Sequence, residues 1–287
     1  RLFKNAKKVD KFLINYLKKQ KYSLLVKPMK YGVISGGKKI RSTIILDLGK
    51  IYNIKEKQLL NICAAVECIH SYSLIHDDLP CMDNDAIRRG KPSTHVKFGE
   101  ASAVLAGSSL LTLAFEIIAD KKYSLHSKEK NEIVRSLAAC SGHTGIAGGQ
   151  ELDLKFENKK KKISQIIEMQ KKKTGKLFNF CLYAVGVIAN KKKKEKKFLA
   201  NLGEEIGLLF QLADDFLDKK GTKRILGKPV KKDNKKGKST LLNLMGEKKA
   251  YLYANKLKKK ILRKIEKHGK KAKDLTHTIQ FILERKF

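Results

Sequence analysis

Tryptophan is absent from the 287-residue chain, proline occurs four times and cysteine five times. The cysteines show no Cys-x-x-Cys spacing, and most of them lie in apolar stretches of helical type, which argues against a zinc site or a disulfide framework. We therefore expect buried free thiols in a reducing compartment, which favours a cytoplasmic protein. No secretory signal is visible where the sequence begins, at Arg1.

Long apolar runs are scarce as well. The longest, residues 101–118, is interrupted by serines and by Glu116. A membrane span needs about 20 consecutive and mainly apolar residues. This segment therefore favours a buried core helix, and we expect no stable membrane insertion.

Arginine is rare in a chain that is otherwise very basic. The formal net charge is +36, yet only eight of the 64 basic residues are arginine, and aromatic residues make up 7% of the sequence. Nucleic-acid-binding surfaces usually combine arginine with stacking aromatics. The lysines are instead spread along the whole chain, a bias typical of an AT-rich genome that codon usage would test. We expect no nucleic-acid partner, although the charge should steer anionic substrates toward the protein.

Alternation of apolar and polar residues with the period of a β-strand is almost missing. Helical spacing is common instead, and 42% of the residues are hydrophobic. No long linker rich in proline, glycine or serine divides the chain. We predict one all-α domain over residues 1–287, in which the most apolar helices are surrounded by others. The predicted helices are 3–26, 42–52, 58–78, 100–119, 130–147, 163–189, 198–218 and 248–266.

Two clusters of aspartate each follow an apolar helical stretch. Such acids are costly to desolvate unless a cation neutralises them, and oxygen-only clusters suit Mg²⁺, which also bridges to phosphates. Two solvated helix ends are the alternative; two such clusters in one very basic chain favour metal binding. The first cluster contains Asp77, Asp78 and Asp83, and the second contains Asp214, Asp215 and Asp218.

Basic residues that could bind an anion stand apart from the general lysine background in a few places. A glycine-rich turn at 36–37 leads into a helix that begins near Arg41, and a helix N-terminus and an arginine are both good anion partners. Lys39 is interpreted as a solvated turn residue. Arg88 and Arg89 are adjacent, so they point in different directions, toward two anions or toward surface ion pairs. His70 lies two helical turns before Asp77 on the same face, so a structural and a functional role are equally open.

Two polar interruptions occur between apolar helical segments. Lys173-Thr174-Gly175 places a lysine where an anionic partner or a wet cavity is needed, and the glycine permits a kink that exposes a carbonyl. Gln150 and Asp153 follow a Gly-Gly pair and could face the same cavity. Two of the longer loops, 79–98 and 219–243, follow the aspartate clusters, which makes them candidate lids.

The motifs occur in a characteristic order: Gly-Gly-Lys-x-x-Arg, Asp-Asp-x-x-x-x-Asp, Arg-Arg-Gly, Gly-Gly-Gln-x-x-Asp, Lys-Thr-Gly, Gln-Leu-Ala-Asp-Asp-x-x-Asp and Gly-Lys-Ser-Thr. Over residues 30–245 this order resembles the trans-isoprenyl diphosphate synthases, and most of all the bacterial farnesyl diphosphate synthases, which have two extra residues in the first aspartate motif. Lys231 and the segment Thr240-Leu241-Leu242 depart from the family pattern and put the lid geometry in question.

The resemblance implies a bundle of long helices around a central cavity and a homodimer that uses Mg²⁺, with three ions expected and Mn²⁺ as a possible substitute. All six aspartates would hold metal, with Asp77, Asp83 and Asp214 as principal ligands. Lys173, Thr174 and Gln211 would stabilise the carbocation, Thr174 and Lys173 through backbone oxygens. The allylic diphosphate would contact Arg88, Lys173, Lys228 and Lys238, and isopentenyl diphosphate would contact Lys38, Arg41, His70 and Arg89.

The implied product is farnesyl diphosphate, made from isopentenyl diphosphate and the allylic substrates dimethylallyl and geranyl diphosphate. Tyr72 and Ser73, one turn before Asp77, would limit the product length. The alternatives are a geranyl or geranylgeranyl diphosphate synthase, a catalytically decayed binding subunit and a basic nucleic-acid binder.

Overall fold

Helices form nearly all of the regular structure. The computed structural model describes every residue except 22, 35, 221–239 and 285–287. The helices of the first half are α1 (Leu2–Lys18), α2 (Val26–Val33), α3 (Ile40–Ile51), α4 (Glu56–Asp77), α5 (Thr94–Phe98), α6 (Glu100–Ala119) and α7 (Ser127–Ser141). Those of the second half are α8 (Ile146–Phe156), α9 (Ile163–Gln170), the π-helix η1 (Lys171–Gly175), α10 (Lys176–Ile188), α11 (Lys193–Lys220), α14 (Leu241–Met245), α15 (Glu247–Glu266), the 3₁₀-helix η2 (Gly269–Ala272) and α16 (Lys273–Glu284).

Within the described part of the chain, strand pairing is confined to one short ribbon. Strands β1 (Ile87–Arg88) and β2 (Lys91–Pro92) run antiparallel, with Ile87 opposite Pro92. They lie inside the segment predicted as a loop after the first aspartate cluster. The predicted all-α class is therefore confirmed.

Helices α4 and α10 lie at the centre of the bundle because their sequences are apolar on nearly every side. Residues 62–69 of α4 and 184–187 of α10 are all buried, and Phe178 and Phe180 of α10 are fully enclosed. A helix that is apolar all round must be covered by other helices. Burying each large apolar side chain contributes roughly 1.5–3 kcal/mol, so these two helices contribute strongly to the core.

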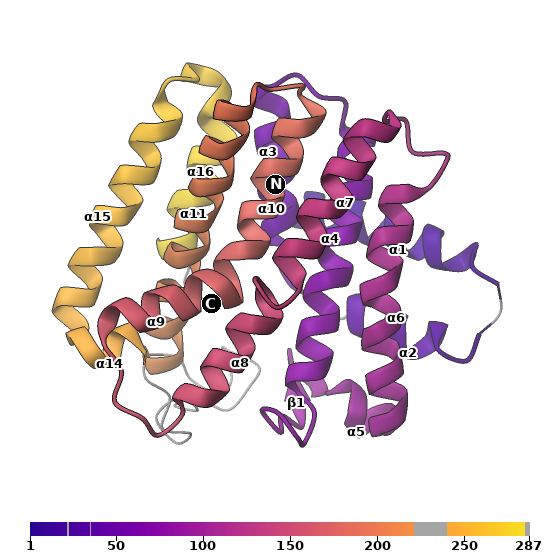
Figure 1. Ribbon diagram of the computed structural model, residues 1–287, viewed down its shortest axis with the longest axis horizontal. Coiled ribbons are helices and arrows are strands. Elements are labelled where there is room, and N and C mark those ends of the chain that lie inside the picture. Colours follow the sequence, from indigo (N-terminus) through magenta and orange to yellow (C-terminus); the bar gives the residue numbers. More distant parts are fainter. Residues whose placement is uncertain (22, 35, 221–239, 285–287) are drawn as a thin grey trace.

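The other long helices pack around this centre in a recognisable order. From left to right in Figure 1, α15 packs on α11, α11 on α10, and α4 on α6 at the other side, with α3 and α7 against α10. Both α4 and α11 lead toward the lower end of this view, where β1 and α14 follow them. The C-terminal ends of these two helices carry the aspartate clusters, and both thus lie at one end of the bundle.

The predicted helices differ from the structure in several places, and α5 and α14 lie in segments that were predicted to be loops. Residues 130–147 were expected to form one helix, but α7 ends at Ser141 and α8 begins at Ile146, because Gly142 and Gly145 let the chain turn between them. The helix expected over 3–26 ends at Lys18, and a separate α2 follows it. Helix α16, whose buried face includes Leu275, Ile279 and Ile282, was not predicted at all.

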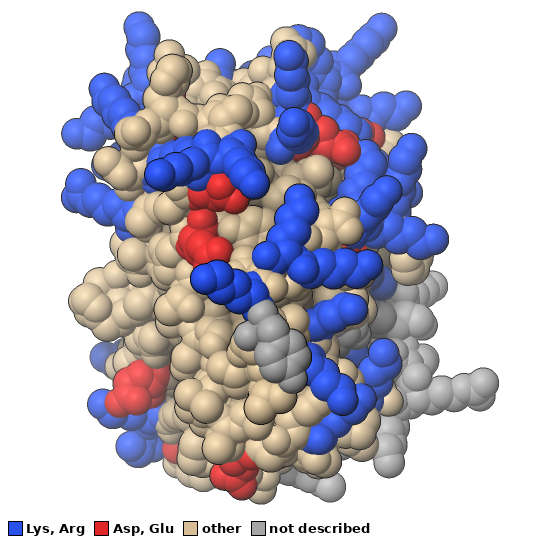
Figure 2. Space-filling model, turned by 90° about the vertical axis from the view of Figure 1, so that its right-hand side faces the viewer, with Lys and Arg blue, Asp and Glu red and all other residues tan. Residues whose placement is uncertain are grey.

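Helix α6 is buried on one side and exposed on the other. By length and composition it could cross a membrane, but nearly half of its most apolar stretch is buried against the rest of the protein. Its outer side carries Val104 and Leu105, which are 42% and 53% exposed. Figure 2 shows the side of the molecule on which α6 lies, where basic side chains flank a broad area that bears no charge.

Candidate active site

The first aspartate cluster forms a closed turn at the C-terminal end of α4. Asp77 is the last residue of the helix, and its carbonyl oxygen accepts a hydrogen bond of 2.8 Å from the amide of Asp83. The amide of Asp85 donates in the same way to the carbonyl of Asp78, at 3.0 Å. The two additional residues of this motif therefore belong to a turn that brings Asp83 back beside Asp77.

The carboxyl group of Asp77 lies in an environment that is unfavourable for its charge. Burial, together with the nearby negative charges of Asp83 and Asp78, raises its pKa to about 6, although Lys173 and Arg88 oppose the shift. A carboxylate that is both desolvated and crowded by other carboxylates is stabilised by a bound cation. This local chemistry fits a hard divalent ion such as Mg²⁺.

Asp78 and Arg88 form an ion pair with each other. The Arg88 Nε donates to both carboxylate oxygens of Asp78, at 3.1 and 3.2 Å, and its Nη2 donates to Oδ1 as well. A second aspartate, Asp85, lies 3.6 Å from the same guanidinium. Asp78 is buried, so the structure places it behind the turn as a support for Arg88.

The second cluster lies on α11 and is joined to a polar network. Asp215 is buried, and its carboxylate accepts hydrogen bonds from Gln211 Nε2 at 3.0 Å and from Gln170 Nε2 at 3.4 Å. Gln211 Oε1 in turn accepts from the hydroxyl of Thr174 at 3.0 Å. Asp214 and Asp218 are half-buried and stand one helical turn apart.

The π-helix η1 lies between the two clusters. The predicted break at Lys173-Thr174-Gly175 is present as this π-helix, and such insertions are frequent at functional sites. Lys173 acts electrostatically on Asp77, whereas Thr174 contacts Gln211, which contacts Asp215. Through these two adjacent residues, η1 connects the aspartates of α4 with those of α11.

Helix α8 fixes the position of Lys173. The Nζ atom of Lys173 lies 2.6 Å from Asp153 Oδ2, so the predicted anionic partner of this lysine is Asp153. Close approach of the two backbones is possible only because residue 149 is glycine, since a Cβ there would lie 2.1 Å from the Lys173 amide nitrogen. Gln150 is also buried, and neither atom of its amide has a hydrogen-bond partner among the described residues.

Several cations act on His70, which lies two helical turns before Asp77 on the same face of α4. Burial lowers the pKa of His70 well below its usual value, and the charges of Arg41, Arg89, Lys39 and Arg88 lower it further. A neutral imidazole can still donate one N–H to an anion, while the surrounding cations supply the positive charge. His70 therefore belongs to this basic cluster, and its ring is uncharged at neutral pH.

The side chains of the basic cluster come from three parts of the chain. The Arg41 guanidinium lies over the rings of Phe178 and Phe210, at 4.7 and 5.5 Å, and Lys38 Nζ lies 4.9 Å from the ring of Phe281. Arg89 donates a hydrogen bond to the carbonyl of Gly36. Aromatic faces hold both Lys38 and Arg41 by cation–π contact.

Lys39 was interpreted as a solvated turn residue, and that interpretation is wrong. Its side chain is only 2% exposed, and its Nζ lies 3.2 Å from Asp10 and 3.6 Å from Glu67. Sequence reasoning also passed over Glu67. An acid inside the otherwise apolar run 62–69 was the available signal, because a buried carboxylate needs a partner.

The residues expected to limit product length occupy the last turns of α4. The Tyr72 ring is half-buried and meets the ring of His76 edge-on at 5.2 Å. Burial raises the pKa of Tyr72, and Asp77 adds to the effect. The hydroxyl of Ser73 donates to the carbonyl of His70 within the same helix, at 2.9 Å.

The remaining predictions concern the candidate lid and the metal ligands. Lys228, Lys238 and the glycines at 221, 227 and 237 of the candidate lid lie outside the described residues. Among the residues that are described, no three His, Cys, Asp or Glu side chains are assembled in a metal-binding group. Nevertheless, all six predicted ligands are carboxylates, the donor type that Mg²⁺ prefers.

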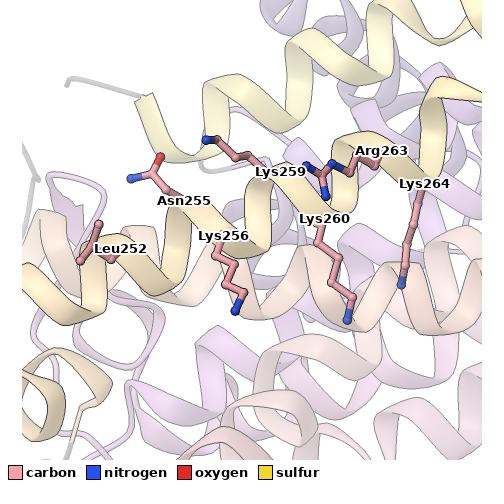
Figure 3. Close-up of a pocket in the computed structure, with 7 residues that line it drawn as sticks. All are labelled: Leu252, Asn255, Lys256, Lys259, Lys260, Arg263 and Lys264. Carbon is pink, nitrogen blue, oxygen red and sulfur yellow. The ribbon is translucent and has the colours of Figure 1, made fainter.

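A large groove lies apart from the aspartates. Its volume is about 740 Å³, and Figure 3 shows the side chains that line it, all of them from α15. Lys260 and Lys264 in this groove pair with Glu205 of α11, at 2.8 and 2.7 Å. None of the residues expected in the active site lines this groove. We therefore place the candidate active site around η1 and not in the groove.

Comparison with known proteins places the chain in a family. The polyprenyl synthetase profile matches residues 22–281. The farnesyl diphosphate synthase of Bacillus subtilis (strain 168) is 41% identical over 228 residues, which cover 78% of this chain and 77% of that protein.

Solved structures agree with this assignment. An FPP/GFPP synthase from Zymomonas mobilis superposes with a TM-score of 0.88 at 35% identity, covering 98% of this chain and 97% of that one. A geranyltransferase from Helicobacter pylori, complexed with magnesium and isoprenyl diphosphate, gives a TM-score of 0.83 at 31% identity, covering 98% and 95%. With its helical bundle, its two aspartate clusters and these similarities, the chain belongs to the polyprenyl synthetase family.

Proposed function

We propose that this protein is a Mg²⁺-dependent prenyltransferase that condenses isopentenyl diphosphate with dimethylallyl and geranyl diphosphate to give farnesyl diphosphate. The observation that carries the proposal is the position of η1: Lys173 acts electrostatically on Asp77 of α4, and Thr174 is linked to Asp215 of α11 through Gln211. The basic cluster around His70 supplies a separate place for a second diphosphate. Its bacterial relatives are farnesyl diphosphate synthases.

The metal would be held by Asp77, Asp83 and Asp214, with Asp218 one turn from Asp214. When bound, Mg²⁺ neutralises the charge that develops on the departing diphosphate, and Mn²⁺ can substitute for it. Asp78 and Asp215 have a supporting role, because one is paired with Arg88 and the other with two glutamines. Three ions, one of them at the α11 cluster, are the number we propose.

The chain's own residues would act on the two substrates in different ways. Lys173 and Arg88, with Lys228 and Lys238, hold the allylic diphosphate and stabilise its negative charge as it leaves. Lys38, Arg41, His70 and Arg89 hold isopentenyl diphosphate. The Lys173 and Thr174 carbonyls and Gln211 stabilise the allylic cation. The double bond of isopentenyl diphosphate attacks this cation and forms the new carbon–carbon bond. The released diphosphate takes up the proton that the adduct then loses, so no side chain is required as a base.

The decisive experiment is incubation with labelled isopentenyl diphosphate, an allylic primer and Mg²⁺, followed by sizing of the prenyl alcohols. We expect a 15-carbon product. A 10- or 20-carbon product would identify a geranyl or geranylgeranyl diphosphate synthase instead, and a 25-carbon product would match the second activity named for the Zymomonas relative. Binding without diphosphate release would indicate a decayed binding subunit.

Tyr72 is proposed to set the product length. Replacing Tyr72 by alanine should remove the half-buried ring beside His76 and let the chain grow past 15 carbons. Tyr72→Phe, which keeps the bulk, is the matched control and should retain the 15-carbon product. Chromatography of the products decides, and an unchanged distribution in Tyr72→Ala would exclude Tyr72 as the length determinant.

We also propose that the protein is a homodimer formed through the outer side of α6. This side exposes Val104 and Leu105, while Val96 of the preceding α5 is 53% exposed. Leu105→Asp should give a monomer, because a dimer interface would have to bury an unpaired carboxylate. Leu252→Asp on α15, where the leucine is 60% exposed, is the matched control and should leave the mass unchanged. Light scattering coupled to gel filtration measures both; a dimeric Leu105→Asp protein would contradict this interface.

Three further proposals concern the protein as a whole. Residues 1–287 form one polyprenyl synthetase domain, since one hydrophobic core extends from Val9 to Ile282. The protein works in the cytoplasm, because all five cysteines are free and four of them are buried. The protein does not insert stably into membranes, and it does not bind nucleic acid. A DNA affinity far above the substrate affinity would refute the proposal that it does not bind nucleic acid.

A further inference from the structure

Lys39 sits in a backbone conformation that a lysine rarely adopts. It precedes α3 with φ 43° and ψ 52°, in the left-handed region, and it follows Gly36 and Gly37, which also have positive φ. A residue with a side chain remains in this region only where its surroundings hold it there. Contacts of the Lys39 side chain must therefore outweigh the preference of its backbone.

Three acceptors surround the buried ammonium group. Lys39 Nζ donates to the carbonyl of Val33 at 3.2 Å and forms ion pairs with Asp10 at 3.2 Å and Glu67 at 3.6 Å. The Val33 carbonyl accepts the hydrogen bond, and the two carboxylates balance the charge of the buried ammonium. Val33 ends α2, Asp10 belongs to α1 and Glu67 to α4. One side chain thus ties three helices to the turn before α3.

Glu67 is itself held in place. Its Oε1 accepts a hydrogen bond of 2.6 Å from the hydroxyl of Ser42, in the first turn of α3, while its Oε2 faces Lys39. Glu67 is 4% exposed, so its charge depends on these two partners. The carboxylate therefore connects the start of α3 to α4 both directly and through Lys39.

The turn that Lys39 secures carries the basic cluster. Lys38 and Arg41 lie on either side of it and rest on aromatic rings, and Arg89 donates to the carbonyl of Gly36 in the same turn. A Cβ on Gly37 would lie 2.9 Å from the Arg89 guanidinium carbon, so turn and guanidinium are in direct contact. A shift of this turn would displace several cations at once.

We propose that Lys39 is a positioning residue for the isopentenyl diphosphate site. Its ammonium does not touch the substrate; it holds the Gly36–Lys39 turn so that Lys38, Arg41 and Arg89 converge on one anion. This rests on the proposed function and extends it, because it assigns the assembly of that subsite to a buried ion-pair cluster of α1, α2 and α4. The allylic subsite around η1 does not depend on Lys39.

The test uses Lys39→Met, which keeps an unbranched stem and removes the charge, and Lys39→Arg, which keeps the charge. The affinity for isopentenyl diphosphate is measured by calorimetry without added metal, and the KM of each substrate is measured in the assay. Lys39→Met should weaken isopentenyl diphosphate binding about tenfold and leave the KM for geranyl diphosphate within about twofold, because only one subsite loses its preorganisation. Lys39→Arg should restore most of the affinity, and Lys30→Met, an exposed lysine of α2, is the control without effect.

A double variant separates the effect of Lys39 on the isopentenyl diphosphate site from its effect on the stability of the fold. Lys39→Met leaves Glu67 buried without its cation and should lower the melting temperature, whereas Lys39→Met/Glu67→Gln removes that charge and should recover much of it. Affinity for isopentenyl diphosphate should remain weak in the double variant, because the turn is still unsecured. The proposal would be overturned if the double variant recovered that affinity. It would also be overturned if Lys39→Met raised both KM values equally, or if it changed neither the affinity nor the KM values. If the unaltered protein neither bound isopentenyl diphosphate nor formed product, both the proposed function and the role of Lys39 would be wrong.

Discussion

Asp77→Asn should lower kcat/KM by about 10³-fold or more while leaving the fold intact. Loss of one group that stabilises charge in the transition state typically costs about 10²–10³-fold, and a principal metal ligand contributes both to binding the ion and to orienting it. Rates are measured with geranyl and isopentenyl diphosphate at saturating Mg²⁺. The loss should persist at raised Mg²⁺, because the neutral amide is a weaker ligand at any ion concentration.

Although Asp77→Asn should lower the activity, it should raise the stability of the folded protein at neutral pH. The pKa of Asp77 is about 6 in the folded protein, above the usual value of 3.8, so its ionised form is less favourable folded than unfolded. Stability is therefore lost as the pH rises from about 4 to about 6, where the unfolded chain releases this proton first. At pH 7 without metal, Asp77→Asn should raise the melting temperature, and the gain should vanish below pH 4.

Asp85→Asn is the matched control in the same turn. Asp85 is buried and lies 3.6 Å from Arg88, but it is not among the proposed ligands. It should cost no more than about tenfold in rate, which is the effect of weakening one ion pair near the site. Equal losses in Asp77→Asn and Asp85→Asn would mean that the whole turn, and not the Asp77 carboxylate, is what the reaction needs.

The sequence was sufficient for the fold class and for the positions of the central helices. Helices α4 and α10 are apolar on nearly every side, a pattern that leaves little choice other than burial within a bundle. Their amphipathic neighbours were harder to delimit. Helix α16 packs on α3 and α11 through Leu275, Ile279 and Ile282, a helical spacing that the sequence already shows and that the prediction overlooked.

The motifs predict which side chains form the site, but they do not predict which of them contact each other. Arg88 was assigned to a diphosphate, whereas in the structure it pairs with Asp78, ten residues away. Gln211 was assigned to the carbocation, and its amide joins Thr174 to Asp215. Such pairings depend on the path of the backbone between motifs, which residue spacing does not specify.

Lys39 illustrates the same limit for burial. Among 64 basic residues nothing local distinguishes it from the lysines around it, and the general rule that lysines are solvated gave the wrong answer. Its partners Asp10 and Glu67 are 29 positions before it and 28 after it and become neighbours only when α1 and α4 pack together. The polar break at residues 171–175 was more informative, because a lysine enclosed between two apolar helical segments requires an anion or water.

Lys173→Met should reduce kcat by about 10²–10³-fold, the second-largest effect we expect. The ammonium lies 2.6 Å from Asp153 and acts on Asp77, so it is placed beside the carboxylates that would hold the metal. In the reaction this cation would stabilise charge on the departing diphosphate, a contribution of about 3–4 kcal/mol for one well-placed group. The KM for the allylic substrate should rise as well, and the KM for isopentenyl diphosphate should not.

Lys172→Met separates this role from a general loss of charge. Lys172 is the preceding residue of the same π-helix, but its Nζ pairs with Glu168 at 3.4 Å within its own helical segment. Its removal should change kcat by less than about threefold, as is usual for a surface ion pair. If both variants lost activity equally, the effect would belong to the stability of η1. If Lys173→Met retained full activity, Asp153 and Lys173 would be only a packing contact between α8 and η1, and the allylic diphosphate would have to be held by other cations.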